Sequence, residues 1–234
     1  MSVDGILLID KPEGWTSHDV VAKVRGRLKS QTGVKVKVGH TGTLDPLATG
    51  LLILTVGKAC KRAGEFSKLD KTYEVGMKLG ETSSTGDSEG EISDFSWTAP
   101  GNVKVKQRRP DEKEVSLVVN SFVGEVEQVP PKFSAIKVNG QRAYKLARQG
   151  KEVKLQPRNV TIYDISQIIY KYPNISFMVS VSSGTYIRSL AVDIGQKLNT
   201  GAYMTSLRRL TVGTFKLANS YPLQEVTLDS ISHD

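Results

Sequence analysis

Hydrophobic residues follow two periods along the chain, one typical of strands and one typical of helices. Short apolar or alternating runs bounded by turn residues predict strands over 5–10, 51–56, 72–79, 134–138, 160–170, 175–182 and 210–217. Apolar residues spaced three and four apart predict a helix that starts at Thr16 and helices over 111–122 and 187–198. Because the strands cluster and the helices come at irregular intervals, the pattern favours an α+β fold with a largely antiparallel sheet.

The first helix has a clear start signal. Thr16 and Asp19 stand in the Thr-x-x-Asp arrangement of a capping box, and the preceding segment 11–14, Lys-Pro-Glu-Gly, predicts a turn after the first strand. Further along, the segment 83–109 is long and rich in Ser, Gly and charge. Connections of this length in compact domains are typically functional or disordered.

Chain length and cysteine content exclude several classes of protein. The 234 residues correspond to one large domain or two small ones, and a chain of this size folds without disulfide or metal staples. Cys60 is the only cysteine, which excludes an intrachain disulfide and a multi-cysteine zinc site and favours a reducing compartment. Apolar runs are too short for a signal peptide core or a membrane span. We therefore expect a cytoplasmic protein with no membrane association.

The charge is positive and unevenly distributed. Lys and Arg number 32 against 24 Asp and Glu, which gives a net charge of +8 and suggests a polyanionic partner such as nucleic acid. Segment 20–39 contains basic residues and no acid, so we expect a positive rim beside a cleft there. A short basic cluster follows at 104–109, and the acidic run 81–94 is interpreted as a solvated face.

Familiar cofactor motifs are missing from the sequence. Neither Gly-x-x-x-x-Gly-Lys-Ser/Thr nor Gly-x-Gly-x-x-Gly occurs. His18, His40 and His233 lie too far apart in the sequence to have metal-site spacing. We expect neither a nucleotide cofactor nor a metal ion.

The most unusual stretch is 39–50, Gly-His-Thr-Gly-Thr-Leu-Asp-Pro-Leu-Ala-Thr-Gly, between two apolar runs. One interpretation is a surface loop that turns at Asp45 and Pro46. The other is a tight loop that holds the Asp45 carboxylate at the end of a strand. In that case the glycines permit close approach of a substrate, and Pro46 stiffens the chain after the acid.

A second candidate segment, 183–189, joins a predicted strand to a predicted helix. Arg188 follows the apolar Ile187 and need not share its buried face, so it could pair with a carboxylate or contact a phosphate. Tyr73 stands at the start of a predicted strand, and 207–210 reads Leu-Arg-Arg-Leu. Taken singly, such features are more often structural than functional.

Taken together and in order, these segments resemble the bacterial tRNA pseudouridine-55 synthase (TruB) family. The likeness spans roughly Gly5 to Phe215, and the block 39–50 is its most specific part. The matching segments are 10–17 (Asp-Lys-Pro-x-Gly-x-Thr-Ser), 39–50, 71–73, 130–137, 144–150, 184–188 and 207–210.

The resemblance implies a fold and an activity. The fold is the pseudouridine-synthase fold, with a mixed, mainly antiparallel sheet flanked by helices. The activity is that of an isomerase that converts uridine 55 in the T loop of tRNA to pseudouridine without metal or organic cofactor. The partner is then the T stem-loop of tRNA, with no obligatory protein partner, and we expect a monomer.

The resemblance also carries residue roles. Asp45 matches the family's catalytic aspartate, and Arg188 matches its basic partner. The resemblance implies that the catalytic residues are Asp45, Tyr73 and Arg188. It implies that the substrate-binding residues are His40, Tyr73, Tyr186, Leu207 and Lys11.

These residue types suit the chemistry. Breaking N1–C1′, turning the base and joining C5 to C1′ involves no redox change. Asp45 could attack C1′ or assist loss of a ribose proton, and the sequence leaves both routes open. The base must first be extruded from the RNA loop, at a cost of about a few kcal/mol. His40 could fill the vacated space, while Tyr73 could stack on the uracil and help remove the C5 proton.

One departure from the family concerns the end of the chain. Members commonly carry a C-terminal RNA-binding domain of the PUA type, and only 24 residues follow Leu210. We therefore expect residues 1–234 to form a single catalytic domain without that domain. The basic insert at 111–153 is then expected to contribute to RNA binding.

Two other functions compete with this interpretation. One is a uridine isomerase that acts on another RNA, as in the guide-RNA-dependent branch of the family, which uses the extra RNA-binding domain. The other is a non-catalytic chaperone that binds and folds tRNA. The combination of Asp45, Tyr73 and Arg188 argues against a chaperone, because a binder has no need of a carboxylate facing phosphate-rich RNA.

Overall fold

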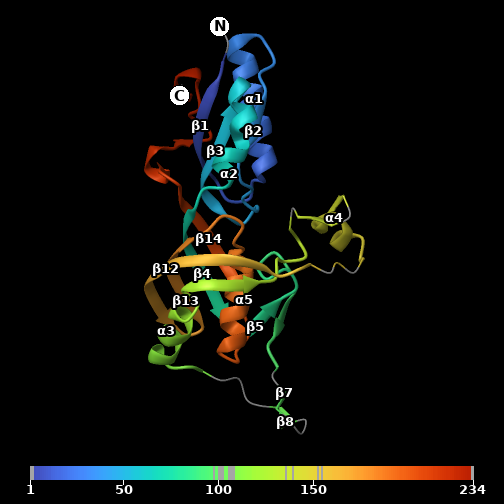
Figure 1. Cartoon of the computed structure of the whole chain (residues 1–234), viewed down its shortest axis with the longest axis vertical. Helices are drawn as coiled ribbons and strands as arrows, with labels where there is room; N and C mark the ends of the chain where they lie inside the picture. Colours follow the sequence, from blue (N-terminus) through green and yellow to red (C-terminus); the bar gives the residue numbers. More distant parts are fainter. Residues whose placement is uncertain are drawn as a thin grey trace. The chain divides into compact units, whose positions relative to one another are not determined.

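The computed structural model describes residues 3–96, 98–99, 103–104, 109–134, 136–138, 140–151, 153 and 155–232 (Figure 1). The chain divides into two compact units. Unit 1 combines Met1–Glu74 with Leu207–Asp234, and unit 2 is Val75–Ser206. Two strands, β4 (Lys71–Leu79) and β14 (Ala202–Val212), run through the boundary between the units.

Unit 1 has a mixed sheet covered by one long helix. β1 pairs antiparallel with β3 along the whole length of β1, from Gly5 opposite Val56 to Lys11 opposite Gly50. β2 adds to β3 antiparallel, whereas β14 pairs with β3, and β16 with β1, in parallel. The elements of unit 1 other than β4 and β14 are β1 (Gly5–Lys11), α1 (Ser17–Thr32), β2 (Val38–His40), β3 (Thr49–Val56), η1 (Gly57–Arg62), α2 (Ala63–Ser67), β15 (Phe215–Lys216), η2 (Leu217–Asn219), β16 (Tyr221–Pro222) and η3 (Leu228–Ser230).

Local sequence explains the limits of α1. Thr16 is the N-cap, and its hydroxyl accepts from the backbone N–H of Asp19 while the Asp19 carboxylate accepts from that of Thr16. This is the predicted capping box. Gly33 ends the helix in the left-handed conformation, with φ 74°. The apolar stripe of α1 is buried, as its spacing predicted; its members are Val20, Val21, Val24 and Leu28.

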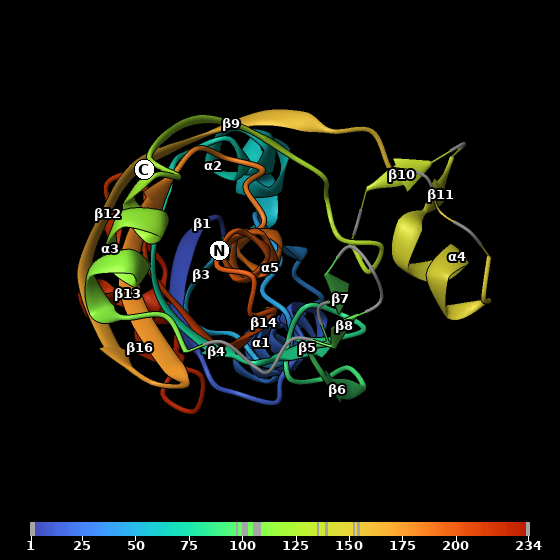
Figure 2. The ribbon, with the colours of Figure 1, turned by 90° about the horizontal axis from the view of Figure 1, so that it is seen from below.

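Unit 2 is built on long antiparallel strands. β12 pairs antiparallel with both β9 and β13, and α3 packs against β12. Figure 2 views α5 nearly end-on, with β12 and β13 curving past one side of it. The remaining elements of unit 2 are β5 (Glu81–Ser83), β6 (Ile92–Asp94), β7 (Thr98–Ala99), β8 (Val103–Lys104), α3 (Glu112–Asn120), β9 (Gly124–Gln128), β10 (Lys137–Val138), β11 (Gln141–Arg142), α4 (Ala143–Arg148), β12 (Arg158–Lys171), β13 (Asn174–Val181) and α5 (Ile187–Lys197).

The predicted α+β class with a mainly antiparallel sheet is confirmed, and two predicted strands are wrong in extent. The strand expected over 210–217 begins earlier, at Ala202. It ends at Val212, because Gly213 turns the chain with φ 54° before β15. The strand expected over 134–138 is only Lys137–Val138. Of the basic cluster at 104–109, Lys106 and Arg108 lie outside the described residues.

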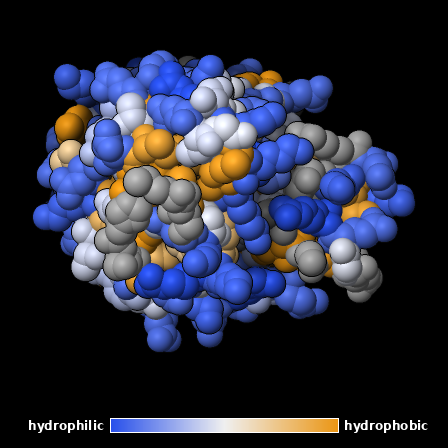
Figure 3. All heavy atoms as spheres, turned by 90° about the horizontal axis from the view of Figure 1, so that it is seen from above, coloured by the Kyte–Doolittle hydropathy of each residue, from blue (hydrophilic) through white to orange (hydrophobic). Residues whose placement is uncertain are grey.

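The surface fits the polar composition of the chain. The face shown in Figure 3 is mostly hydrophilic, with scattered apolar patches. Within the part of the chain that the structure describes, no helix is long and apolar enough to cross a membrane.

A substitution at Gly50 tests the pairing between β3 and β14. Its φ is +97°, and a Cβ there would overlap the Arg209 carbonyl oxygen and lie 2.7 Å from the Arg209 nitrogen. We expect Gly50→Ala to lower the free energy of unfolding by about 3 kcal/mol, through left-handed strain and backbone overlap. Urea unfolding of the purified variant measures this.

The matched control is Gly26→Ala in α1, where an added Cβ meets nothing within 4 Å. That change should raise stability by about 0.5–1 kcal/mol, because alanine is the better helix former. Equal effects at the two positions would contradict the assigned register.

Candidate active site

The loop that carries Asp45 is fastened to the start of α1. It connects β2 to β3 in unit 1, and Leu44 and Ala48 on either side of Asp45 are buried. The buried Ser17 hydroxyl donates to the Leu44 carbonyl at 2.9 Å and accepts from the Leu44 N–H at 2.8 Å. One side chain thus satisfies both backbone groups of the residue before Asp45.

The residue after Asp45, Pro46, is held by the turn between β1 and α1. The Pro46 carbonyl accepts from the Gly14 N–H at 2.9 Å and from the Lys11 ammonium at 3.3 Å. Ala48 donates to the Asp45 carbonyl at 3.0 Å, which closes the predicted turn. Asp45 itself is half-buried. The residues on both sides of it, Leu44 and Pro46, are fixed by these hydrogen bonds.

Lys11 is fully buried at the end of β1. Its ammonium donates to the carbonyls of Pro12 at 2.9 Å and Trp15 at 2.6 Å as well as to Pro46. Burial of an ammonium is costly unless its donors are satisfied, and these carbonyls satisfy them. The contacts join the turn after β1 to the Asp45 loop.

His40 is the last residue of β2 and directly precedes this loop. Its ring meets the ring of His18 edge-on, with centroids 5.6 Å apart and planes 69° apart. His18 is exposed in the first turn of α1. Sequence spacing gave no reason to connect these two histidines, because their contact depends on how α1 packs beside β2.

Tyr73 lies in β4 and is buried, and Lys71 two residues earlier shares its face of the strand. The Lys71 ammonium donates to the carbonyls of Ser67, at 2.8 Å, and Leu69. Burial, with a smaller effect of the nearby Arg209 charge, lowers the pKa of Lys71 to about 8.

The Leu-Arg-Arg-Leu step in β14 is tied to the other segments of unit 1. Arg208 makes an ion pair with Asp10 at 2.7 Å, next to Lys11. Arg209 is buried and donates to the carbonyls of Gly42, near the start of the Asp45 loop, and Leu51, in β3 after it. Leu207, the predicted substrate contact, is half-buried directly before them.

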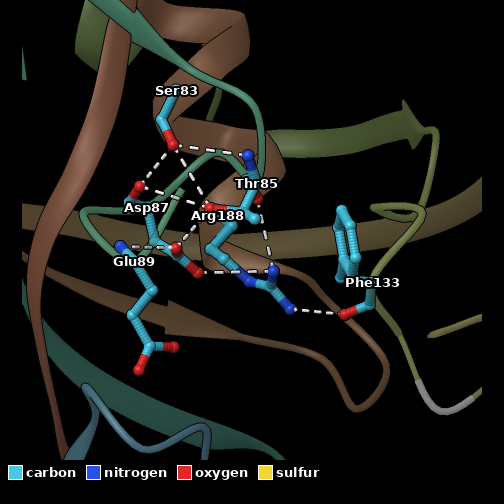
Figure 4. Close-up of polar contacts among 6 residues, drawn as sticks. All are labelled: Ser83, Thr85, Asp87, Glu89, Phe133 and Arg188. Atoms are coloured by element: carbon cyan, nitrogen blue, oxygen red, sulfur yellow. Dashed lines mark hydrogen bonds and ion pairs between the residues drawn. The ribbon is translucent and has the colours of Figure 1, made fainter. Parts of the chain in front are cut away.

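Arg188 is the centre of a buried polar network in unit 2 (Figure 4). Its side chain leaves the first turn of α5 and makes an ion pair with Asp87 at 3.3 Å. It also donates to the carbonyls of Thr85, at 3.3 Å, and Phe133, at 2.8 Å. Of the two roles that the sequence left open, the described contacts favour pairing with a carboxylate over a phosphate contact.

Asp87 is a candidate that the sequence analysis missed. The acidic run 81–94 was expected to be solvated, but Asp87 is only 2% exposed, so that interpretation is wrong at this residue. The available signal was its turn chemistry, because its carboxylate accepts from the Glu89 N–H and the Thr85 hydroxyl, as aspartates in such turns do. Pairing of Arg188 with Asp45, which belongs to unit 1, stays a prediction.

Tyr186 is positioned by a second residue that the sequence analysis missed. The buried Gln128 donates to the Tyr186 carbonyl at 3.0 Å and accepts from its N–H at 2.8 Å. Of the predicted site residues, unit 1 contains Lys11, His40, Asp45, Tyr73 and Leu207, and unit 2 contains Tyr186 and Arg188. Among the described residues, no cluster of His, Cys, Asp and Glu could hold a metal ion.

Two family models together match residues 29–233 of the chain. Residues 29–187 match the model described as TruB family pseudouridylate synthase (N terminal domain), and residues 188–233 match the tRNA pseudouridylate synthase B C-terminal domain. The chain belongs to the TruB family. The loop of Asp45, Tyr73 and the Arg188–Asp87 pair all fall within these matched ranges.

Curated relatives and solved structures agree with membership in the TruB family. tRNA pseudouridine synthase B of Dechloromonas aromatica is 46% identical over 97% of this chain and 71% of its own length, and that of Clostridium kluyveri is 45% identical over 98% and 74%. A solved Cbf5–Nop10–Gar1 complex matches with a TM-score of 0.69 and 29% identity, over 96% of this chain and 54% of that chain. An H/ACA RNP bound to a substrate RNA matches with a TM-score of 0.66 and 27% identity, over 96% of this chain and 52% of that chain. This chain therefore spans about half the length of those two solved chains.

The Arg188–Asp87 pair should stabilise unit 2 strongly. Asp87→Asn removes the carboxylate charge that lies 3.3 Å from the buried guanidinium, and we expect the free energy of unfolding to fall by about 3 kcal/mol at pH 7. The control is Glu65→Gln, because Glu65 and its partner Arg62 have side chains 61% and 47% exposed. That change should alter stability by less than about 0.5 kcal/mol. A loss under about 1 kcal/mol for Asp87→Asn would contradict the buried pair.

Lys71 should make stability depend on pH. Since its pKa falls to about 8 in the folded state from 10.5, the unfolded chain binds the proton more tightly, so stability should rise between pH 8 and 10.5. The rise is limited to about 3 kcal/mol. Urea unfolding of the wild type and of Lys71→Met across this range isolates it, since the variant lacks the titrating group. Parallel curves would argue against a buried, charged Lys71.

Proposed function

We propose that this protein isomerises a uridine in the T loop of tRNA, at position 55, to pseudouridine, with Asp45 as the catalytic carboxylate. The observation that carries the proposal is the loop of Asp45, which is pinned at Leu44 and Pro46 within a chain of the TruB family. Relatives named tRNA pseudouridine synthase B, 45–46% identical over nearly the whole chain, support tRNA as the substrate.

The pinned loop suits a carboxylate that must act at the sugar. The isomerisation breaks N1–C1′, the uracil turns, and C5–C1′ forms. A proton then leaves C5 and N1 gains one, so the product has the same atoms as the uridine. Asp45 acts either as the nucleophile at C1′ or in removal of a ribose proton. In both routes a small displacement of the carboxylate from the sugar is costly, so fixed neighbours at positions 44 and 46 are an advantage.

The other predicted residues take supporting parts in this proposal. Tyr73 stacks on the uracil and assists loss of the C5 proton, and Arg188 pairs with the ionised Asp45. His40 and Leu207, with Tyr186, contact the extruded nucleotide. The buried, carbonyl-bound ammonium of Lys11 suits support of the Asp45 loop better than direct contact with substrate.

The charge of the chain supports RNA binding. The net charge of +8 favours a phosphate backbone, and α1 and the residues after it carry basic side chains without an acid from Val20 to Gly39. We propose that this basic segment and the insert at 111–153 contact the T stem-loop, and that the protein acts as a monomer without a protein partner.

The deciding experiment is Asp45→Asn. The amide keeps the size of the side chain and removes the charge needed at the sugar, so we expect loss of pseudouridine formation with tRNA affinity within severalfold of wild type. Transcribed tRNA is incubated with each protein without additives, and pseudouridine is mapped chemically along the RNA.

The control is Asp229→Asn, an exposed aspartate in η3, which should turn over as wild type does. Turnover of Asp45→Asn near the wild-type rate would refute the role of Asp45. Tight tRNA binding by the wild type without any product would instead favour the chaperone function, and product at another uridine would favour a different substrate.

A further inference from the structure

Arg209 connects the start of the loop that carries Asp45 to the strand that follows the loop. Its Nε donates to the Leu51 carbonyl at 2.7 Å, and its Nη2 donates to the Gly42 carbonyl at 3.1 Å. Gly42 precedes Asp45 by three residues and Leu51 follows it by six. A single guanidinium therefore bridges the start of the loop and strand β3, into which the loop leads.

The backbone of Arg209 also lies against the end of the Asp45 loop. In the parallel pairing of β14 with β3, Arg209 lies opposite Gly50. Gly50 leaves no room for a side chain there, because its Cβ would overlap the Arg209 backbone. The strand and the side chain of Arg209 thus fix the end of the loop together.

Burying the charge of Arg209 has a desolvation cost that a purely structural contact does not require. The residue is 2% exposed, and it takes part in none of the ion pairs found among the described residues. Lys71, a second buried cation, is close enough for Arg209 to lower its pKa. A neutral donor could satisfy a carbonyl at lower desolvation cost, whereas the rigid, planar fork of arginine can reach two carbonyls in a fixed geometry.

We propose that Arg209 is a positioning residue for catalysis, which sets the place of the Asp45 carboxylate by bridging Gly42 and Leu51. The proposal rests on the proposed role of Asp45. Ser17 and Lys11 hold the middle of the loop at Leu44 and Pro46, and Arg209 holds its start against β3, so the carboxylate keeps its position while the base turns.

Arg209→Lys tests this, because lysine keeps the charge but replaces the planar fork, whose Nε and Nη2 reach separate carbonyls, by a single ammonium. We expect kcat for tRNA to fall about 10–100-fold, as a misplaced catalytic group does, with KM within about threefold of wild type. The control is Arg62→Lys at an exposed arginine, which should leave both constants unchanged. An unchanged kcat, or a loss that appears equally in KM, would overturn the proposal.

A double-mutant cycle with Ser17→Ala separates positioning from general loss of fold. Both residues act on one loop, so their effects on kcat should be coupled, with the double variant losing clearly less than the product of the single losses. Additive effects would count against the proposal. If Arg209→Lys does not fold, Arg209→Gln replaces it in the same cycle.

Wild type and Asp45→Asn are assayed beside these variants. An active wild type with an inactive Asp45→Asn supports the proposed function, and the Arg209 variants then test the positioning role alone. An active Asp45→Asn would remove the proposed function itself, whatever the Arg209 variants do.

Discussion

The fastening of the Asp45 loop to the segment between β1 and α1 is the constraint on which the candidate site depends. Ser17 holds Leu44 through both of its backbone groups, and Gly14 and Lys11 hold Pro46. Each contact spans about 27 to 35 residues of sequence, so the shape of the loop depends on contacts between segments that are far apart along the chain. Buried, fully satisfied polar contacts of this kind favour one arrangement, because any other leaves an unpaired polar group out of water.

In unit 2 the buried guanidinium of Arg188 is the interaction that connects distant segments. Arg188 would be expensive to bury alone, and Asp87, with the carbonyls of Thr85 and Phe133, compensates its charge and satisfies its donors. The contact to Phe133 joins α5 to the start of the segment that holds β10, β11 and α4. The same guanidinium therefore orders three stretches of chain that are far apart in sequence.

Much of the fold was predictable because its signals are local. The capping box at Thr16 and the apolar stripe behind it define the start and the buried face of α1, and the alternation in β4 and β13 defines those strands. The prediction for β14 failed, because Gly213 turns the chain within an apolar stretch and the strand begins at Ala202. A run of apolar residues does not reveal a turn whose glycine N–H is satisfied by the distant Asp70 carbonyl.

By itself the sequence determined the α+β class, the family resemblance and the block around Asp45, because these depend on residue types at short spacing. Only the tertiary structure decided the partners of Lys11, Arg188 and Arg209. Sequence analysis interpreted Asp87 as part of a solvated acidic run, and folding buried it against Arg188, 101 positions along the chain. The physical reason is that charge and hydropathy along the chain show what a residue can do, whereas the cost of burying an ion is settled by whichever distant group folding places beside it.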